Sequence, residues 1–186
     1  MFKIAGHTMG TPEYTVCEAL ELLHRIGADG VEIVVQNDYR SGLPCDCNEN
    51  TLAEVRRCAE QNNIQIICLT PYNSYFNSLD EPVRQREIAA IKKVMGYCDQ
   101  LGTKYIRIYG GNLAAGDTEK LAERRARLIE SMRELGDAAA EKGVTLVIEN
   151  HFNTMAVSAK ESASLIREID HPAVRILYDQ ANLTFT

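Results

Sequence analysis

Two acidic side chains at the ends of apolar, strand-like segments are the residues of this sequence best suited to chemistry. The segment LVIENH ends in Glu149, Asn150 and His151, and the segment VRILYD ends in Asp179. Carboxylate oxygens can bind a hard divalent cation, and a well-placed carboxylate can accept or return a proton. A buried strand that ends in polar groups must also supply partners for them, because burying them unpaired is costly. We therefore interpret Glu149 and Asp179 as candidate active-site residues.

Other polar side chains stand at or just beyond the ends of strand-like segments. The five that we predict to bind substrate are His7, Glu32, Arg107, His151 and Asn182. Simpler roles compete with these assignments. Glu32 and Arg107 would form a buried ion pair, because an unpaired inward charge is costly. Glu149 could cap a helix or pair with Arg107, and Asp179 could shape a turn. His151 could be an ordinary loop histidine.

The elements that must position these residues are visible in the hydrophobic period, which switches repeatedly between 2 and 3.6. Strands are predicted at 2–7, 31–35, 64–69, 105–110, 144–149 and 174–179. Five helices are predicted between them, beginning near Thr11, Thr51, Asp80, Thr118 and Ser158. The apolar face predicted for the fourth helix comprises Leu121, Leu128, Met132 and Leu135.

This alternation predicts parallel strands joined by right-handed crossovers. An open doubly wound sheet is disfavoured, because GHTMGT after the first strand has the wrong spacing for a phosphate-binding turn. The sequence holds five strand–helix units and a sixth strand, whereas a complete (β/α)8 barrel has eight units. We therefore predict one α/β domain over residues 1–186, an incomplete TIM barrel with six parallel strands and five helices. Active sites of barrels lie at the C-terminal strand ends, where the candidate residues stand.

Charge and hydropathy argue against several classes of function. The net charge of −6 and the pI of about 5.3 are unlike those of a nucleic-acid-binding protein. No apolar run approaches the length of a membrane span, and the N-terminal residues lack the apolar region of a signal peptide. We therefore expect a cytoplasmic protein that binds neither nucleic acid nor a membrane.

The six cysteines show no spacing typical of a disulfide framework, so we expect all of them to be reduced. Cys45 and Cys47 flank Asp46 in a polar segment and could form a metal or redox site. Because a Cys-x-Cys motif alone lacks a second pair of ligands, two loop thiols are the favoured interpretation.

The motifs GHTMG, GADGVEI, IYGG, VIENH and LYDQAN, in this order at successive strand ends, resemble the xylose-isomerase-like TIM barrel superfamily of sugar isomerases, epimerases and dehydratases. The resemblance implies a divalent metal, which would be manganese, magnesium, cobalt or zinc. It also implies that Glu149 and Asp179 are two of its ligands and that Glu149 is the catalytic acid or base. The family's other two ligands, on strands seven and eight, would lie beyond Thr186, so we expect the chain to hold half of the metal site.

The implied activity is that of an isomerase or epimerase acting on a sugar or sugar-like α-hydroxy carbonyl through an enediolate. The alternatives are a dehydratase of the inosose or dehydroshikimate type and a non-catalytic, truncated barrel that forms homo-oligomers. Two features depart from ketose 3-epimerases, which carry His where this chain has Asn182 and a further Glu in the segment 153–155. The apurinic endonuclease branch is disfavoured, because the histidines of its zinc site are missing.

Overall fold

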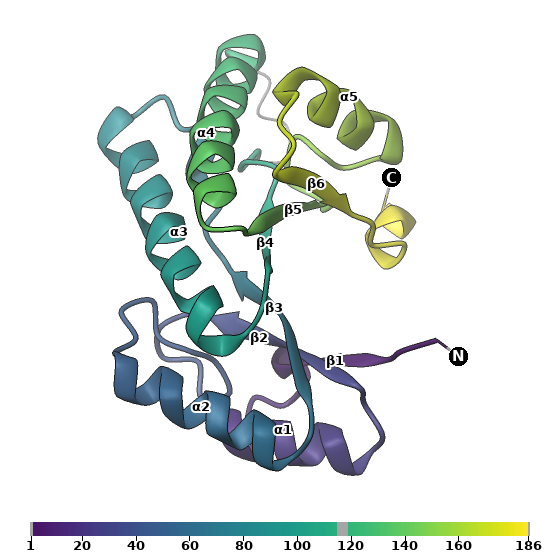
Figure 1. Ribbon diagram of the computed structural model, residues 1–186. Coiled ribbons are helices and arrows are strands. Elements are labelled where there is room, and N and C mark those ends of the chain that lie inside the picture. The colour runs from purple at the N-terminus through teal and green to yellow at the C-terminus, as the bar shows by residue number, and fades with distance from the viewer. Residues whose placement is uncertain (1, 115–118, 186) are drawn as a thin grey trace. The chain divides into compact units, whose positions relative to one another are not determined.

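The computed structural model describes residues 2–114 and 119–185 (Figure 1). Its strands are β1 (Ala5–His7), β2 (Gly30–Val35), β3 (Gln65–Pro71), β4 (Tyr105–Tyr109), β5 (Thr145–Glu149) and β6 (Val174–Leu177). Its α-helices are α1 (Val16–Arg25), α2 (Glu49–Gln61), α3 (Glu81–Leu101), α4 (Leu121–Glu141) and α5 (Ala159–Ile169). Short 3-10 helices lie at η1 (Thr8–Gly10), η2 (Tyr75–Asn77) and η3 (Ala181–Phe185).

The strands form one sheet in chain order, β1-β2-β3-β4-β5-β6. β1 pairs with β2 in parallel, as do β2 with β3 and β5 with β6. The predicted α/β class, with six parallel strands and five helices, is therefore confirmed. Neighbouring parallel strands must be joined by crossovers, and α-helices occupy these connections.

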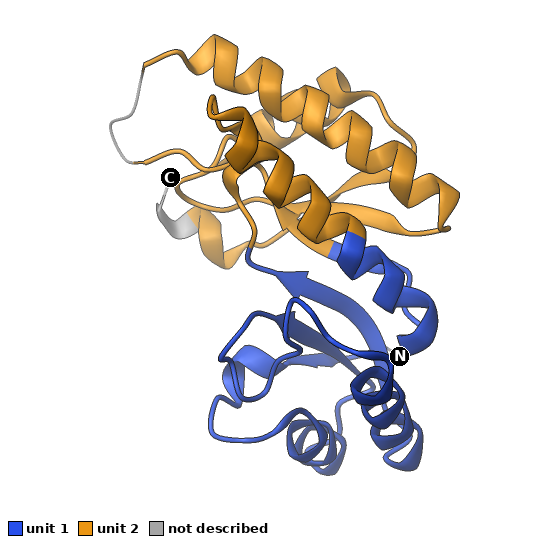
Figure 2. Ribbon diagram, turned by 90° about the vertical axis from the view of Figure 1, so that its left-hand side faces the viewer, with its two compact units in different colours: residues 1–72, 93–106 blue, residues 73–92, 107–186 orange. Residues whose placement is uncertain are grey.

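The chain divides into two compact units, residues 1–72 with 93–106 and residues 73–92 with 107–186 (Figure 2). We call them unit 1 and unit 2. The assignment of residues 1–186 to a single domain stays a prediction.

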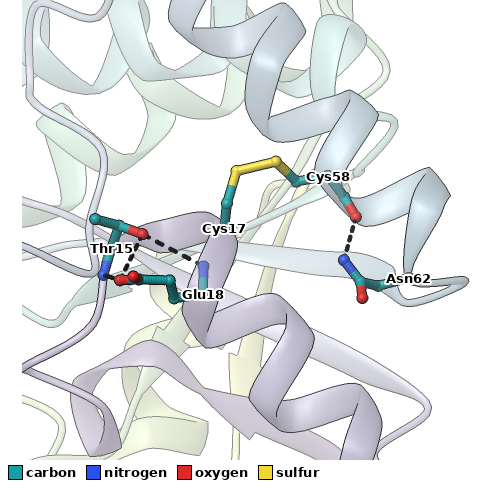
Figure 3. Close-up of a disulfide and its surroundings, with 5 residues drawn as sticks. All are labelled: Thr15, Cys17, Glu18, Cys58 and Asn62. Carbon is teal, nitrogen blue, oxygen red and sulfur yellow. Dashed lines mark hydrogen bonds between the residues drawn. A yellow bond between two sulfur atoms is a disulfide. The ribbon is translucent and has the colours of Figure 1, made fainter.

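In unit 1, α1 begins later than predicted. Its N-cap is Thr15, whereas the hydroxyl of Thr11 donates to the Thr8 carbonyl oxygen at 3.0 Å. Thr15 is the better cap because Glu18 completes a capping box: its carboxylate accepts from the Thr15 backbone N–H at 2.7 Å (Figure 3). The N-cap of α2 is likewise Asn48 rather than Thr51.

A disulfide between Cys17 and Cys58 joins α1 to α2 (Figure 3). The expectation that all cysteines are reduced is therefore wrong for this pair. The two residues are 41 positions apart in the sequence, but helix packing brings their Cα atoms to 5.6 Å, within the range that a disulfide needs. Cys45, Cys47, Cys68 and Cys98 are free thiols. Burial raises the pKa of Cys98 to about 12, so this thiol is an unreactive core residue.

In unit 2, α4 packs against η2 and the sheet. Of the apolar face predicted for this helix, Leu128, Met132 and Leu135 are fully buried, whereas Leu121 is 38% exposed. The predicted helix start at Thr118 falls outside the described residues. The predicted helix start at Ser158 is confirmed: Ser158 is the N-cap of α5, and Ser158 and Glu161 bond reciprocally in a capping box.

Within the described residues, no helix is long and apolar enough to cross a membrane.

Candidate functional site

The two carboxylates singled out by the sequence lie at the ends of neighbouring strands in unit 2. Glu149 is the last residue of β5 and pairs in register with Leu177, the last residue of β6; Asp179 follows two positions later. The side chain of Asn182 reaches both acids. Its Nδ2 atom lies 3.4 Å from Glu149 Oε1 and 3.0 Å from Asp179 Oδ2. One amide nitrogen thus contacts both carboxylates, so the two acidic side chains lie close together.

Asn150 holds the end of β5 to the segment after β6, a role that the sequence did not reveal. Its Nδ2 donates to the Asp179 carbonyl oxygen at 2.7 Å, and its Oδ1 accepts from the Asp179 backbone N–H at 2.7 Å. The side chain is almost fully buried, with 1% of the residue exposed. A buried amide satisfied on both sides is a rigid connection. The only signal in the sequence was its position between Glu149 and His151.

Replacing Asn150 with alanine is expected to lower the free energy of unfolding by about 1–3 kcal/mol, because two backbone groups of the half-buried Asp179 lose their hydrogen-bond partner. Affinity for Mn²⁺ should fall by about 10- to 100-fold, as when a supporting hydrogen bond behind a metal ligand is lost. Chemical denaturation and Mn²⁺ titration by electron paramagnetic resonance measure the two effects. Asn73→Ala is the control, because it removes a half-buried amide that bonds Glu87 instead. Equal Mn²⁺ affinity in the two variants would contradict a supporting role for Asn150.

Arg107, on β4, contacts the carboxylate of Glu149. Its Nε atom is 3.3 Å from Glu149 Oε2, and its guanidinium carbon is 4.4 Å from the centre of the Tyr109 ring. The side chain of Arg107 is 5% exposed and that of Glu149 14%. The alternative that Glu149 pairs with Arg107 is therefore found in the structure. The pairing of Arg107 with Glu32 stays a prediction.

Burial raises the pKa of the Glu149 carboxyl above its ordinary value. Arg107 and His151 oppose this rise, and the nearby Asp179 carboxylate adds to it. Burial also raises the pKa of the Tyr109 hydroxyl. An acid whose charged form is destabilised in this way accepts a proton more readily than an exposed carboxylate does.

His151 is held in a defined orientation. Its Nδ1 atom lies 2.7 Å from the Phe152 carbonyl oxygen, so Nδ1 carries the hydrogen. Its ring is 5.0 Å from the Tyr109 ring in an edge-on arrangement and 4.1 Å from the Phe152 ring. His151, two residues after Glu149, is thus held by its hydrogen bond to Phe152, as an ordinary loop histidine would be, and its role in binding substrate stays a prediction.

The other two predicted residues lie together in unit 1. His7 and Glu32 stand opposite each other in the register of β1 and β2, with His7 Nε2 3.8 Å from Glu32 Oε2. His7 Nδ1 accepts from the Met9 backbone N–H at 3.0 Å, so Nε2 carries the hydrogen that faces Glu32. This pair can bond hydroxyl groups of a ligand.

The chemistry of Glu149 and Asp179 fits a hard divalent cation. Both offer carboxylate oxygens, and both contact the amide nitrogen of Asn182, a donor that a cation could replace. Among the described residues, no group of three or more His, Cys, Asp or Glu side chains is arranged to hold a metal. Glu149 and Asp179 would therefore be only part of a complete set of ligands.

Comparison with known proteins gives a family match over most of the chain. The sequence model described as the xylose isomerase-like TIM barrel matches residues 20–186. An inosose dehydratase of Geobacillus thermodenitrificans is 39% identical over 59 residues, which are 32% of this chain and 20% of that protein. The L-ribulose-5-phosphate 3-epimerase UlaE of Escherichia coli is 23% identical over 170 residues, which are 90% of this chain and 59% of the epimerase.

A solved xylose isomerase-like TIM barrel protein of Mycobacterium smegmatis, in complex with magnesium, has the same fold. Its TM-score is 0.79 at 18% identity, and the match covers 98% of this chain and 68% of that one. The chain spans less than two thirds of the length of the two relatives matched by sequence.

Proposed function

Because the chain belongs to the xylose isomerase-like TIM barrel family, we propose that it acts as a divalent-metal-dependent isomerase or epimerase on a sugar or sugar-like α-hydroxy carbonyl. The observation that carries this proposal is the pair of carboxylates on neighbouring strand ends, Glu149 and Asp179, facing one amide. One of the pair, Glu149, has a pKa raised by burial. These two observations support a metal site and a proton-transfer group at the same residue.

Glu149 and Asp179 would hold the cation, with manganese, magnesium, cobalt and zinc all suited to carboxylate oxygens. When bound, the cation supplies positive charge beside the substrate oxygens on which negative charge develops. Asn150 fixes the backbone of Asp179, and Arg107 orients the carboxylate of Glu149.

Glu149 removes the proton from the carbon next to the substrate carbonyl. The electron pair of that C–H bond then forms the carbon–carbon double bond of an enediolate. Return of a proton to the neighbouring carbon gives an isomer, and return to the same carbon from the opposite face gives an epimer. We assign binding of the substrate hydroxyls in unit 2 to Arg107, His151 and Asn182. His7 and Glu32, in unit 1, stay predicted substrate-binding residues.

A dehydratase is the second candidate, supported by the 39% identity to the inosose dehydratase over 59 residues. It would use the same proton abstraction by Glu149. The electron pair would then form a carbon–carbon double bond and expel the hydroxyl group on the next carbon, which leaves as water with the proton that Glu149 has taken.

Hydrogen exchange in D2O tests both candidates. We expect the chain with Mn²⁺ to place deuterium on the carbon next to the carbonyl of D-fructose, L-ribulose 5-phosphate or an inosose, as followed by proton NMR. Net loss of water, seen as a new enone absorbance, would select the dehydratase. The control is Asp137→Asn, which removes an acidic side chain of unit 2 that is 78% exposed. It should exchange deuterium at the wild-type rate. No bound Mn²⁺ and no exchange with any of the three would overturn the proposal and favour a non-catalytic barrel.

A further inference from the structure

A small pocket in unit 2 is lined by side chains that the catalytic proposal leaves largely unused. Its volume is about 160 Å³. Three rings, those of Tyr109, His151 and Phe152, line it together with the polar side chains of Ser74 and Asn112. Glu149 and Asp179 are not among the residues that line it.

The walls of the pocket are held by hydrogen bonds between the loops after β4 and β5. The Leu113 N–H donates to the Asn153 carbonyl oxygen at 2.7 Å, and the Met155 N–H donates to the Gly110 carbonyl oxygen at 2.8 Å. Gly111 has a φ of +80°, and a Cβ atom there would lie 2.9 Å from the Asn77 side chain. The backbone therefore needs glycine at this point, and the pocket is formed before any ligand arrives.

The lining suits a neutral ring that carries hydroxyl groups. Phe152 is 43% exposed and lies against His151, so an aromatic surface is open to a ligand. Asn112 donates to Ser74 Oγ at 3.2 Å, and together they present amide and hydroxyl groups. Among the described lining residues there is no Lys, Arg, Asp or Glu. A phosphate group would normally be matched by Arg, Lys or a cluster of backbone N–H groups.

The side chains of Arg107 and Tyr109 link the pocket lining to the carboxylate of Glu149. Arg107 contacts Glu149 at 3.3 Å and lies over the Tyr109 ring at 4.4 Å, and Tyr109 lines the pocket. His151, also in the lining, is two residues from Glu149. The pocket therefore shares Tyr109 and His151 with the surroundings of Glu149.

We propose that this pocket binds an uncharged sugar or cyclic polyol ring, with Phe152 and His151 as its aromatic surface and Asn112 and Ser74 as its hydrogen-bonding groups. The inference rests on the proposed function and narrows it. The substrate carries a neutral ring at this place rather than a phosphate ester. The inference therefore assigns neutral, hydroxyl-bearing rings as the ligand class of the loops after β4 and β5.

The test is a titration of the metal-free chain with methyl α-D-glucopyranoside, followed by saturation-transfer NMR. We expect Phe152→Ala to weaken binding about three- to tenfold, because an aromatic contact is lost. Phe152→Tyr should retain binding, which shows that a loss in Phe152→Ala is not caused by unfolding. Tyr105→Ala is the matched control: this aromatic residue is 50% exposed and begins the strand that Tyr109 ends.

Equal affinity of the wild type and Phe152→Ala for the glucoside would overturn the inference. So would tighter binding of inorganic phosphate than of the glucoside, if phosphate shifts the His151 resonances. Mn²⁺ binding is measured on the same samples. Loss of glucoside binding in Phe152→Ala with unchanged Mn²⁺ binding supports the pocket assignment. Absence of Mn²⁺ binding in the wild type counts against the proposed function and leaves a Phe152-dependent glucoside site intact.

Discussion

Glu149→Gln is expected to reduce the rate of deuterium exchange into substrate by about 10²- to 10⁴-fold, the usual contribution of a positioned acid or base. Glutamine keeps the size of the side chain and can still accept a hydrogen bond from Arg107, but it cannot take the proton. Mn²⁺ binding should weaken as well, because one of the two carboxylate ligands is lost. NMR exchange rates and Mn²⁺ titration measure the two effects.

Glu141→Gln is the control for this variant, because Glu141 is an exposed acid at the end of α4, just before β5 begins. It should leave exchange and Mn²⁺ affinity unchanged. An exchange rate in Glu149→Gln within about threefold of the wild type would exclude Glu149 as the base, since even a weak base contributes about 10²-fold.

The raised pKa of Glu149 adds a dependence on pH to the same comparison. A carboxyl whose pKa is raised on folding stabilises the fold below its ordinary pKa of 4.5, and this contribution is lost as the pH rises through the folded value. Glu149→Gln does not lose it, so its melting temperature should rise relative to that of the wild type between pH 4 and pH 7. Metal affinity of the wild type should increase over this range, because the ligand must be deprotonated. Parallel melting curves at all pH values would contradict the raised pKa.

Removing the Cys17–Cys58 disulfide by the double substitution to serine is expected to lower the free energy of unfolding by about 2–4 kcal/mol. The crosslink closes a segment of 41 residues and so restricts the unfolded chain. Urea denaturation of the oxidised wild type and the double variant measures the difference. Reduction of the wild type with dithiothreitol should produce the same loss.

Cys45→Ser is the matched control, because Cys45 is a half-buried free thiol of the same unit. Its stability should change by less than about 0.5 kcal/mol. Thiol titration of the unfolded, unreduced chain provides an independent check, with four free thiols expected from Cys45, Cys47, Cys68 and Cys98. Six reactive thiols would show that the crosslink does not form.

Much of the architecture could be predicted because it follows from local patterns. The predicted strands and helices were confirmed in number, type and order, with shifts at several ends. The predicted start of α1 was several residues too early, because Thr11 followed by Pro12 is typical of an N-cap and the first residue of a helix. The capping box of Thr15 and Glu18 gives the backbone a better start. Leu121, predicted on the apolar face of the fourth helix, is 38% exposed because it is the first residue of α4.

The sequence by itself determined the strand–helix alternation and the placement of Glu149 and Asp179 at strand ends, because both depend on periods of a few residues. Tertiary structure decided which distant side chains meet. Asn150 bonds Asp179 across 29 residues, Asn182 contacts Glu149 across 33, and Cys17 bonds Cys58 across 41. The aromatic pocket likewise needs two loops that follow different strands. No local pattern encodes these pairs, because their closeness is a result of how strands and helices pack once the chain has folded.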